Sequence, residues 1–590
     1  MILAISRILL AAGVLLWLPT AAVAAPSETE IEPVKRAVTA LIEDERESEH
    51  VPGLSLALVD EHGIVWAAGF GYADVEKRVP ARAETIYPVG ALTMPLTAAA
   101  VMQLTEQRAI ELDLPIGKYL PEFSLESRFA SGAPITPRNL LTHHAGLPAA
   151  RFKGIWTPQP LTELVASLKD EHAAYPPDHV HDPSDLGYDV LGRLIEVKTG
   201  QEFTRAMEER LLAPLGMRAS SFARAGVDPA LLAASYWRGK KEIEALAARD
   251  TPAVGLYSSA IELGRFLTLL LREGEIEGRR VLSARSVAEM LRPQNERVAL
   301  DLDNRVGLGL RLSGVRLDRA DRIAWQSDTS LTGRGRILIA PDQKLGVVVI
   351  ANSSTGSRLI ERVSTRLLET ALEARATEPP EPRPHAAAPA VPPPTPDELN
   401  GHYAGLLGLI RVTAEEERVR ANVLGKTLAL EPEPDGRLSV GYRLLGFIPI
   451  PIKVLKEVRV QPARIAGRDL LLLHYKDHLY RLADRIEPEP LPEAWRARLG
   501  EYEPAERDLL LDLIELHALE LRYEEGFLHF YYRLPGWFGL AARVPVKPVS
   551  DTELVIQGNG WLMGETIEVV RRGDEERLRY SGYELKRVAR

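Results

Sequence analysis

The sequence has no cysteine among its 590 residues, so disulfide bonds, cysteine nucleophiles and thiolate metal sites are all excluded. It also lacks an excess of basic residues, because 72 Lys and Arg stand against 82 Asp and Glu and give a net charge of −10. A nucleic-acid partner needs a basic face. The Lys and Arg residues are scattered, so we expect neither a nucleic-acid partner nor a polybasic membrane contact.

Long hydrophobic runs are absent as well. The run at residues 8–18 has 11 residues, whereas a membrane-spanning helix needs about 20. Arg7 precedes this run, and Ala22-Val23-Ala24 supplies small residues for cleavage after it. Residues 1–24 therefore have the pattern of a signal peptide, which predicts export to the periplasm or the exterior. An uncleaved N-terminal anchor is the alternative.

Proline, in contrast, is concentrated in one segment, residues 379–396, where nine of eighteen residues are proline. This composition cannot build a core and favours an extended spacer. The chain length and an apolar fraction of 45% suit about three domains. We therefore predict a large domain at residues 33–376 and a linker at 377–396, with further domains after it.

Strand-like segments lie at both ends of the large domain. Residues 54–71 (LSLALVDEHGIVWAAGFG) are typical of two strands around a turn, and so are residues 335–352 (GRILIAPDQKLGVVVIAN). Helical periodicity occurs between them, for example at residues 96–109 and 186–200. The pattern predicts an α/β (α+β) domain with one antiparallel sheet flanked by helices.

The region after the linker contains a weak internal repeat. GYRLLGFIPIPIKV (Gly441–Val454) matches YYRLPGWFGLAARV (Tyr531–Val544) at an offset of 90 residues. Alternating apolar and polar residues indicate β structure in both copies. We predict two small all-β barrels, at residues 397–485 and 494–590. The two apolar loops of the repeat could contact a membrane or a partner, although internal packing is the favoured interpretation.

Three segments of the large domain resemble the serine β-lactamase and penicillin-binding-protein superfamily. LLTHHAGLP (140–148) is similar to the family's LLTHTSGLP, and GLYSSAIELGRFL (255–267) is similar to its GLYSTAEDLARFL. PDQKLGVVVIAN (341–352) is similar to its last strand pair. The resemblance is strongest to the class C-like branch, which includes D-aminopeptidases and esterases and in which barrel-like domains also occur.

The resemblance implies a Ser-x-x-Lys motif, in which the serine attacks a carbonyl and the lysine takes its proton. The family pattern G-S-x-[ST]-K-x-[FL]-T aligns with GALTMPLT at residues 90–97. Ala91 stands at the serine position and Met94 at the lysine position. The backbone N–H groups of Ala91 and of the region near Thr329 would remain as a pair of oxyanion donors.

The other two motifs implied by the resemblance are also altered. In PDHVHDPSDLGYDVLG (177–192), Pro183 stands at the position of the general-base tyrosine and Asp185 at that of the asparagine. The third motif, Lys- or His-Thr-Gly, falls on Gln326-Ser327-Asp328. Asp328 and Asp185 would repel the carboxylate that active relatives bind, which predicts poor binding of penicillin and of D-alanyl-D-alanine ends.

Together with the signal-peptide pattern, these substitutions predict an exported pseudoenzyme that binds a small molecule or an envelope protein and uses no cofactor. The alternatives are an active serine-type hydrolase, either an esterase or a D-amino-acid peptidase, with an unrecognised nucleophile, and a structural envelope protein that keeps an old fold. Thr93 is better explained as a helix N-cap than as a nucleophile. Ser55 precedes a strand, unlike the serine of a hydrolase elbow. At least one of His143 and His144 is expected to be a hydrogen-bonding loop residue.

A separate hypothesis concerns the segment DHVHDPSD. His179 and His181 alternate and have Asp182 beside them, a pattern that could bind zinc or another divalent ion. An acid-rich loop beside the cleft is the favoured interpretation, because the family to which the sequence is similar has no metal there.

Overall fold

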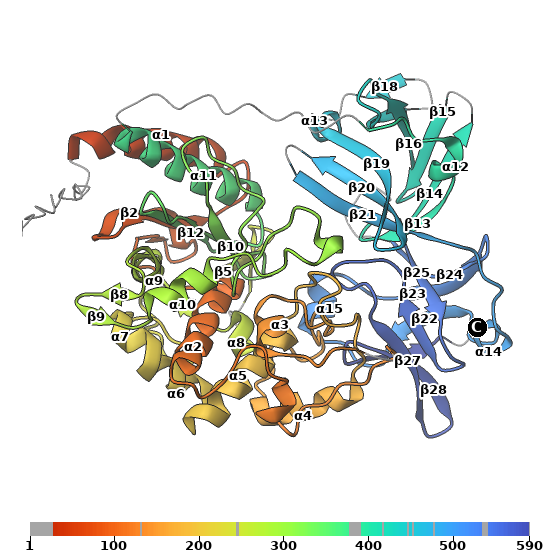
Figure 1. Ribbon diagram of the computed structural model, residues 1–590, viewed down its shortest axis with the longest axis horizontal. Coiled ribbons are helices and arrows are strands. Elements are labelled where there is room, and N and C mark those ends of the chain that lie inside the picture. The colour runs from red at the N-terminus through yellow and green to blue at the C-terminus, as the bar shows by residue number, and fades with distance from the viewer. Residues whose placement is uncertain are drawn as a thin grey trace, which may run out of the picture.

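The computed structural model describes residues 28–129, 132–243, 247–376, 391–415, 418–444, 448–450, 453–475, 478–533 and 541–588. The predicted signal peptide, most of the predicted linker and the tips of the two apolar repeat loops lie outside these residues. In the described part of the chain, no helix combines the length and apolar character that crossing a membrane requires. Figure 1 shows a mixed N-terminal domain with two β-domains beside it.

The N-terminal domain is built on one six-stranded antiparallel sheet, as predicted. Its strand order is β10-β11-β12-β1-β2-β3, so the first and last strand pairs of the domain meet at its centre. The two predicted strand pairs are both confirmed, with turns after Asp60 and Ala340. The bounds are β1 (Gly53–Asp60), β2 (Gly63–Asp74), β3 (Val79–Pro80), β10 (Ala324–Asp328), β11 (Arg334–Ala340) and β12 (Leu345–Ala351).

Side chains of β1 alternate between the two faces of the sheet. Leu54, Leu56 and Leu58 pack with the helices α1 (Glu28–Glu45) and α11 (Ser357–Arg375) in one apolar cluster, while Ala57 and Val59 belong to the cluster of the opposite face. That second cluster contains α9 (Ala260–Leu271), α2 (Met94–Glu106) and α5 (Asp185–Thr199). Both faces are therefore covered by helices, and the predicted helices at residues 96–109 and 186–200 are present.

Smaller elements complete the N-terminal domain. Its short strands pair in three two-stranded sheets, β4 with β7, β5 with β6 and β8 with β9. Their bounds are β4 (Tyr87–Pro88), β5 (Ser235–Trp237), β6 (Lys241–Ile243), β7 (Tyr257–Ser258), β8 (Glu275–Ile276) and β9 (Arg279–Arg280). The further α-helices are α3 (Pro137–Leu141), α4 (Leu161–Ser167), α6 (Phe203–Met207), α7 (Ala213–Leu215), α8 (Thr251–Val254) and α10 (Ala284–Met290).

The first β-domain is a closed barrel of eight strands, to which β18 adds a short ninth strand. The pairing of β16 with β17 closes the ring. The bounds are β13 (Gly401–Gly405), β14 (Gly408–Glu415), β15 (Arg418–Val423), β16 (Lys426–Pro432), β17 (Leu438–Leu444), β18 (Ile448–Ile450), β19 (Val458–Ile465), β20 (Arg468–Tyr475) and β21 (His478–Ile486). The short helices α12 (Pro396–Leu399) and α13 (Lys453–Lys456) accompany it.

The second β-domain is a closed barrel in which eight strands pair in chain order. Two short helices, α14 (Glu493–Arg496) and α15 (Leu509–Leu513), belong to it. The strands are β22 (Gly500–Pro504), β23 (Leu519–Glu524), β24 (Phe527–Arg533), β25 (Ala541–Pro548), β26 (Glu553–Ile556), β27 (Thr566–Arg572), β28 (Glu575–Tyr580) and β29 (Tyr583–Arg587). The prediction of two barrels is thus confirmed.

The offset of 90 residues that suggested the repeat is wrong as a structural alignment. Gly441 lies in β17, the fifth strand of its barrel, whereas Tyr531 lies in β24, the third strand of the other. The equivalent strands at the barrel starts are β13 and β22, which begin 99 residues apart, at Gly401 and Gly500. Similar strand chemistry, with alternating tyrosine, arginine and apolar residues, produced the apparent match.

The second barrel packs directly on the N-terminal domain. Tyr175, Val180 and Leu300 of the N-terminal domain share one buried apolar cluster with barrel residues that include Trp495 and Met563. Hydrogen bonds add to this contact. Arg128 Nη1 donates to Thr566 Oγ1 at 2.8 Å, and the N–H of Phe152 donates to Ser581 Oγ at 2.8 Å. The second barrel and the N-terminal domain therefore share a buried interface.

Candidate functional site

The residue at the implied nucleophile position, Ala91, lies in the short 3₁₀ helix η1 (Gly90–Thr93) directly before α2. Its backbone N–H donates a hydrogen bond to Oδ1 of Asp328 at 3.1 Å. Gly90 has a φ of 51°, and a Cβ atom added to it would lie 2.0 Å from the same carboxyl oxygen. The backbone comes so close to Asp328 that this position requires glycine.

The Asp328 carboxyl group is buried at the end of β10 and is held through both oxygens. Besides the Ala91 contact, Oδ2 accepts a hydrogen bond from Ser330 Oγ at 2.8 Å. Burial raises the pKa of Asp328, although the hydrogen bonds from Ser330 and Ala91 act in the opposite direction. The expectation that the Ala91 N–H remains as a free oxyanion donor is therefore wrong, because this carboxyl group of the same chain already occupies it.

Met94, at the implied lysine position, is 4% exposed and belongs to the apolar core around α2. The Gln326 amide lies against it, with Nε2 3.8 Å from the Met94 sulfur. A thioether is only a weak acceptor. Gln326 of the third predicted motif thus lies beside Met94 of the first, and the contact between these two side chains involves no charged group.

The second motif segment, residues 183–185, lies near Asp328 as well. Ser184 caps α5 by accepting a hydrogen bond from the N–H of Gly187 at 3.1 Å, and Asp185 is the first residue of that helix. Burial and, to a smaller extent, the charges of Asp250 and Asp328 together raise the pKa of Asp185 to about 7. Pro183 stands just before the cap and has no N–H or titratable group. The structure therefore gathers the three predicted motif segments around one acidic corner, which we call the Ala91 corner: Gly90, Ala91, Met94, Asp185, Gln326 and Asp328.

The two hydroxyl groups considered as replacement nucleophiles are engaged in structural bonds. Thr93 Oγ1 donates to the carbonyl of Gly90 at 2.6 Å and accepts from the N–H of Leu256 at 3.1 Å. Thr93 occupies the predicted N-cap position, but its side chain makes no cap hydrogen bond within α2. Ser55 is fully buried in β1, where its hydroxyl lies 2.7 Å from the Tyr87 hydroxyl.

His143 and His144 are hydrogen-bonding residues of a loop, as predicted. His143 Nδ1 accepts from the N–H of Ser184 at 3.1 Å, and burial lowers the pKa of His143 to about 3. His144 is buried between Thr142 and Asp301, with Nε2 2.8 Å from Asp301 Oδ2. These contacts fix the loop that leads toward α5.

The residues of the metal hypothesis have different surroundings. His179 stacks on Tyr175 with ring centroids 5.9 Å apart, whereas the ring of His181 packs edge-on against His143 and His144. Both carboxyl oxygens of Asp182 are buried without a hydrogen-bond partner. Within the described ranges, no group of three or more His, Cys, Asp or Glu side chains is arranged to hold a metal ion.

Asp182 faces a second buried carboxyl group at the contact with the second barrel. Glu565 Oε1 accepts a hydrogen bond from the N–H of Ala149 at 2.8 Å. Burial raises the pKa of Glu565 to about 7, while the bonds from Ala149 and Tyr580 lower it. Burial also raises the pKa of Asp182, and the Glu565 charge adds to this effect. The interface therefore holds two acids that favour the protonated form.

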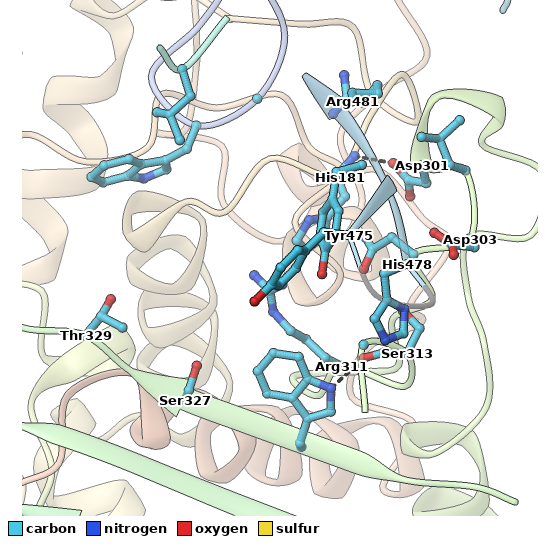
Figure 2. A pocket seen from close by; sticks show the side chains of 18 of the residues that line it. His181, Asp301, Asp303, Arg311, Ser313, Ser327, Thr329, Tyr475, His478 and Arg481 are labelled. Atoms are coloured by element: carbon cyan, nitrogen blue, oxygen red, sulfur yellow. Dashed lines mark hydrogen bonds between the residues drawn. The ribbon is translucent and has the colours of Figure 1, made fainter. Parts of the chain in front are cut away.

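A cavity of about 540 Å³ lies beside the Ala91 corner and is lined by all three domains. Ser327, Asp328 and Thr329 form part of its N-terminal-domain wall, the first barrel contributes β20 and β21, and the loop before β27 contributes Asn559–Trp561. Figure 2 shows Arg311 and Ser327 on the side of the N-terminal domain, with Tyr475, His478 and Arg481 on the barrel side. Sequence reasoning missed this cavity, since its walls come from segments far apart in the chain.

The charged lining of the cavity consists of four carboxyl groups and four arginines, Arg311, Arg334, Arg336 and Arg481. Arg311 and Arg336 both lie over the ring of Trp325, with Cζ atoms 5.2 and 4.9 Å from its centroid. Arg481 comes from the first barrel. None of these residues stands in a recognisable motif. The one sequence signal for this cavity was Trp325, which stands directly before the third predicted motif.

A family model described as Beta-lactamase matches residues 38–372, more than half of the chain. The chain belongs to the beta-lactamase family. Protein flp of Staphylococcus aureus (strain COL) is 24% identical over 344 residues, covering 56% of this chain and 66% of its own. Esterase EstB of Burkholderia gladioli is 31% identical over 205 residues, covering 32% of this chain and 51% of its own. The chain thus spans one half to two thirds of the curated relatives it matches.

Solved structures show the same fold over a larger part of the chain. The octameric penicillin-binding protein homologue from Pyrococcus abyssi is 22% identical, with a TM-score of 0.51, and covers 76% of this chain and 99% of its own. SurE is 23% identical, with a TM-score of 0.56, and covers 77% of this chain and 99% of its own. The resemblance stated from the sequence motifs is confirmed at the level of family and fold.

Proposed function

We propose that the protein is an exported member of the beta-lactamase family that binds a small molecule or an envelope protein in its cleft without hydrolysing it. The hydrogen bond from the Ala91 N–H to Asp328 carries this proposal. A substrate carbonyl would have to displace a buried carboxyl group to reach that donor. The implied serine, lysine and tyrosine positions hold Ala91, Met94 and Pro183, which supply no hydroxyl nucleophile, amine or phenol.

The wall contributed by the two barrels supports a binding role. A cavity of about 540 Å³ suits a small ligand, and its lining combines apolar rings with a few convergent polar groups. SurE has been solved with D-Leu, so D-leucine belongs in the first ligand screen. The predicted poor binding of penicillin and D-alanyl-D-alanine remains part of this proposal, because Asp328 and Asp185 border the Ala91 corner.

A serine-type hydrolase is the second candidate, favoured by the identity of 31% to Esterase EstB. Ser327 is the serine to test, since it lines the cavity beside Asp328. Its backbone N–H donates to Gln326 Oε1 at 3.0 Å, and no base is hydrogen-bonded to its hydroxyl in the described part of the chain. A nucleophile of this kind needs an adjacent base.

The test is labelling of the full-length protein with a fluorophosphonate probe, together with nitrocefin and p-nitrophenyl ester assays. We expect no covalent adduct and no turnover above the buffer rate. An active family member prepared in parallel controls for the reagents. An adduct that maps to Ser327 and disappears in Ser327→Ala would overturn the proposal in favour of the hydrolase.

A further inference from the structure

The cavity beside the Ala91 corner contains cationic side chains without anionic partners. The guanidinium groups of Arg311, Arg336 and Arg481 make no ion pair with any carboxylate that the structure describes. Nε of Arg336 and Nη1 of Arg481 are buried without a hydrogen-bond partner. Burial lowers the pKa of each of the three guanidinium groups. Leaving such donors unpaired costs free energy, so a ligand that pairs them would be favoured.

The carboxyl groups of the same lining are mostly occupied. Asp301 accepts from the N–H of His181 at 2.7 Å and contacts His144, and Asp303 accepts from the N–H of Leu479 at 3.2 Å. Asp328 is bound to Ala91 and Ser330. Glu361, on α11, completes the acidic groups of the lining. The charges of Glu361 and Asp301 act on Arg336 and Arg481 without forming ion pairs in the described part of the chain, so Nε of Arg336 and Nη1 of Arg481 stay without a hydrogen-bond partner.

The position of Arg311 makes it the anchor of this wall. Its guanidinium lies over the Trp325 ring, and the indole N–H of Trp325 donates to the carbonyl of Ser313 at 2.6 Å, which fixes the ring. Figure 2 shows Arg311 reaching from the Ser313 side into the space below Tyr475, with His181 above it. Burial lowers the pKa of His181, and the charges of Arg311 and Arg481 act in the same direction.

Exposed apolar side chains surround the same cavity. Leu406, Tyr480 and Trp561 line it and remain 68%, 45% and 47% exposed. They come from the two barrels, whereas Trp325 comes from the N-terminal domain. An anionic group beside the arginines would therefore have apolar surface next to it for the rest of a ligand.

We propose that Arg311 and Arg481 bind the oxyanion group, a carboxylate or a phosphate, of a small molecule whose flat apolar part packs against Trp325 and the barrel residues of the cavity. Arginine is suited to both groups because its planar fork donates two parallel hydrogen bonds. The site spans two domains, so the ligand also bridges the first barrel and the N-terminal domain. This inference deepens the proposed binding function and rests on it.

The test uses benzoate, phenyl phosphate and uncharged benzamide as probes of the full-length protein, with binding measured by saturation-transfer NMR at millimolar concentrations. We expect both anions to bind and benzamide not to bind. The stronger of the two anions distinguishes a carboxylate site from a phosphate site. Absence of binding by both anions would overturn the inference.

Variants locate the site. Arg311→Gln and Arg481→Gln should each weaken anion binding about tenfold, the effect of losing one charge-assisted hydrogen bond. Arg311→Lys should bind at an intermediate strength, because it keeps the charge and loses the fork. Arg464→Gln is the matched control, since this exposed β19 arginine pairs with Asp469 at 3.5 Å outside the cavity. Equal binding by wild type and Arg311→Gln would refute the assignment.

The outcomes separate this inference from the proposed function. Anion binding that depends on Arg311, combined with serine labelling, would retain the oxyanion site and reject the non-catalytic role. Binding of neutral probes only, without serine labelling, would retain the non-catalytic role and reject the oxyanion site. Thermal unfolding of each variant shows whether a loss of binding reflects a loss of fold.

Discussion

The Ala91 corner and the arginine-lined cavity lie side by side and both contain buried charged groups, but they differ in how those groups are satisfied. At the Ala91 corner, the Asp328 carboxyl accepts hydrogen bonds from Ala91 and Ser330 within the chain. In the cavity, donors of Arg336 and Arg481 remain unpaired. Buried polar groups are normally hydrogen-bonded, so an unpaired set is more informative about ligands than a paired one. The comparison directs the search for a ligand away from the implied nucleophile position.

The largest expected effect tests how tightly the Ala91 corner is closed. In Gly90→Ala the new Cβ would meet Asp328 Oδ1, and a non-glycine residue would adopt a φ of 51°. Left-handed strain and overpacking together predict a loss of about 2–5 kcal/mol. The measurement is the free energy of the first unfolding transition in urea.

A double variant supplies the control for that experiment. Gly90→Ala combined with Asp328→Ala removes the clash and leaves only the backbone strain, so part of the lost stability should return. Non-additivity is expected because the two residues are in contact. A urea unfolding curve for Gly90→Ala equal to that of wild type would contradict the close approach of this backbone to Asp328.

The second prediction concerns the buried acids at the barrel contact. The pKa of Glu565 is raised to about 7, so the folded protein retains a proton that the unfolded chain releases above the ordinary pKa of glutamate. Stability should consequently fall as pH rises from about 4.5 to about 7 and then level off. Glu565→Gln keeps the acceptor for the Ala149 N–H and removes this charge. It should stabilise the protein at pH 8 by about 1–3 kcal/mol.

Thermal melts of wild type and Glu565→Gln across this pH range provide the measurement. The two proteins should converge near pH 4, where glutamate is protonated in both the folded and the unfolded state. The exposed Glu503→Gln on β22, whose partner Lys586 lies 3.1 Å away, serves as the control and should follow wild type. Parallel curves for Glu565→Gln and wild type would show that Glu565 carries no such linkage.

The third prediction sharpens the contrast between paired and unpaired groups. Arg311 is half-buried and makes no ion pair in the described part of the chain, so replacing it by methionine removes a partly desolvated charge and keeps an apolar chain over Trp325. Such replacements are often neutral or stabilising, by about 1 kcal/mol or more. Arg311→Met should therefore melt at the same or a higher temperature while losing anion binding. Clear destabilisation would mean that the guanidinium supports the fold rather than a ligand.

The same contrast explains what the sequence could and could not predict. Local patterns predicted the strand pairs at residues 54–71 and 335–352, and the resemblance to the family gave the expected positions of the three altered motifs, because those signals lie within short segments. The bond between Ala91 and Asp328 joins residues 237 positions apart, and no local pattern contains it. Arg311 and Arg481 likewise meet only because the barrels pack beside the N-terminal domain. The repeat offset of 90 residues was wrong because similar local patterns occur in strands that are not equivalent in the two barrels, β17 and β24.

The smallest expected effect is the outcome of restoring the implied motif. Ala91→Ser with Met94→Lys returns the hydroxyl and the amine, yet Asp328 still occupies the N–H of residue 91 and Pro183 still stands where the resemblance implies a phenol. The new lysine would enter an apolar core beside Gln326, where burial disfavours its charged form. We therefore expect no nitrocefin hydrolysis above background. A burst of acylation in this double variant would mean that the Ala91 corner lacks only its two motif side chains, and that the Asp328 carboxyl group moves aside for a substrate.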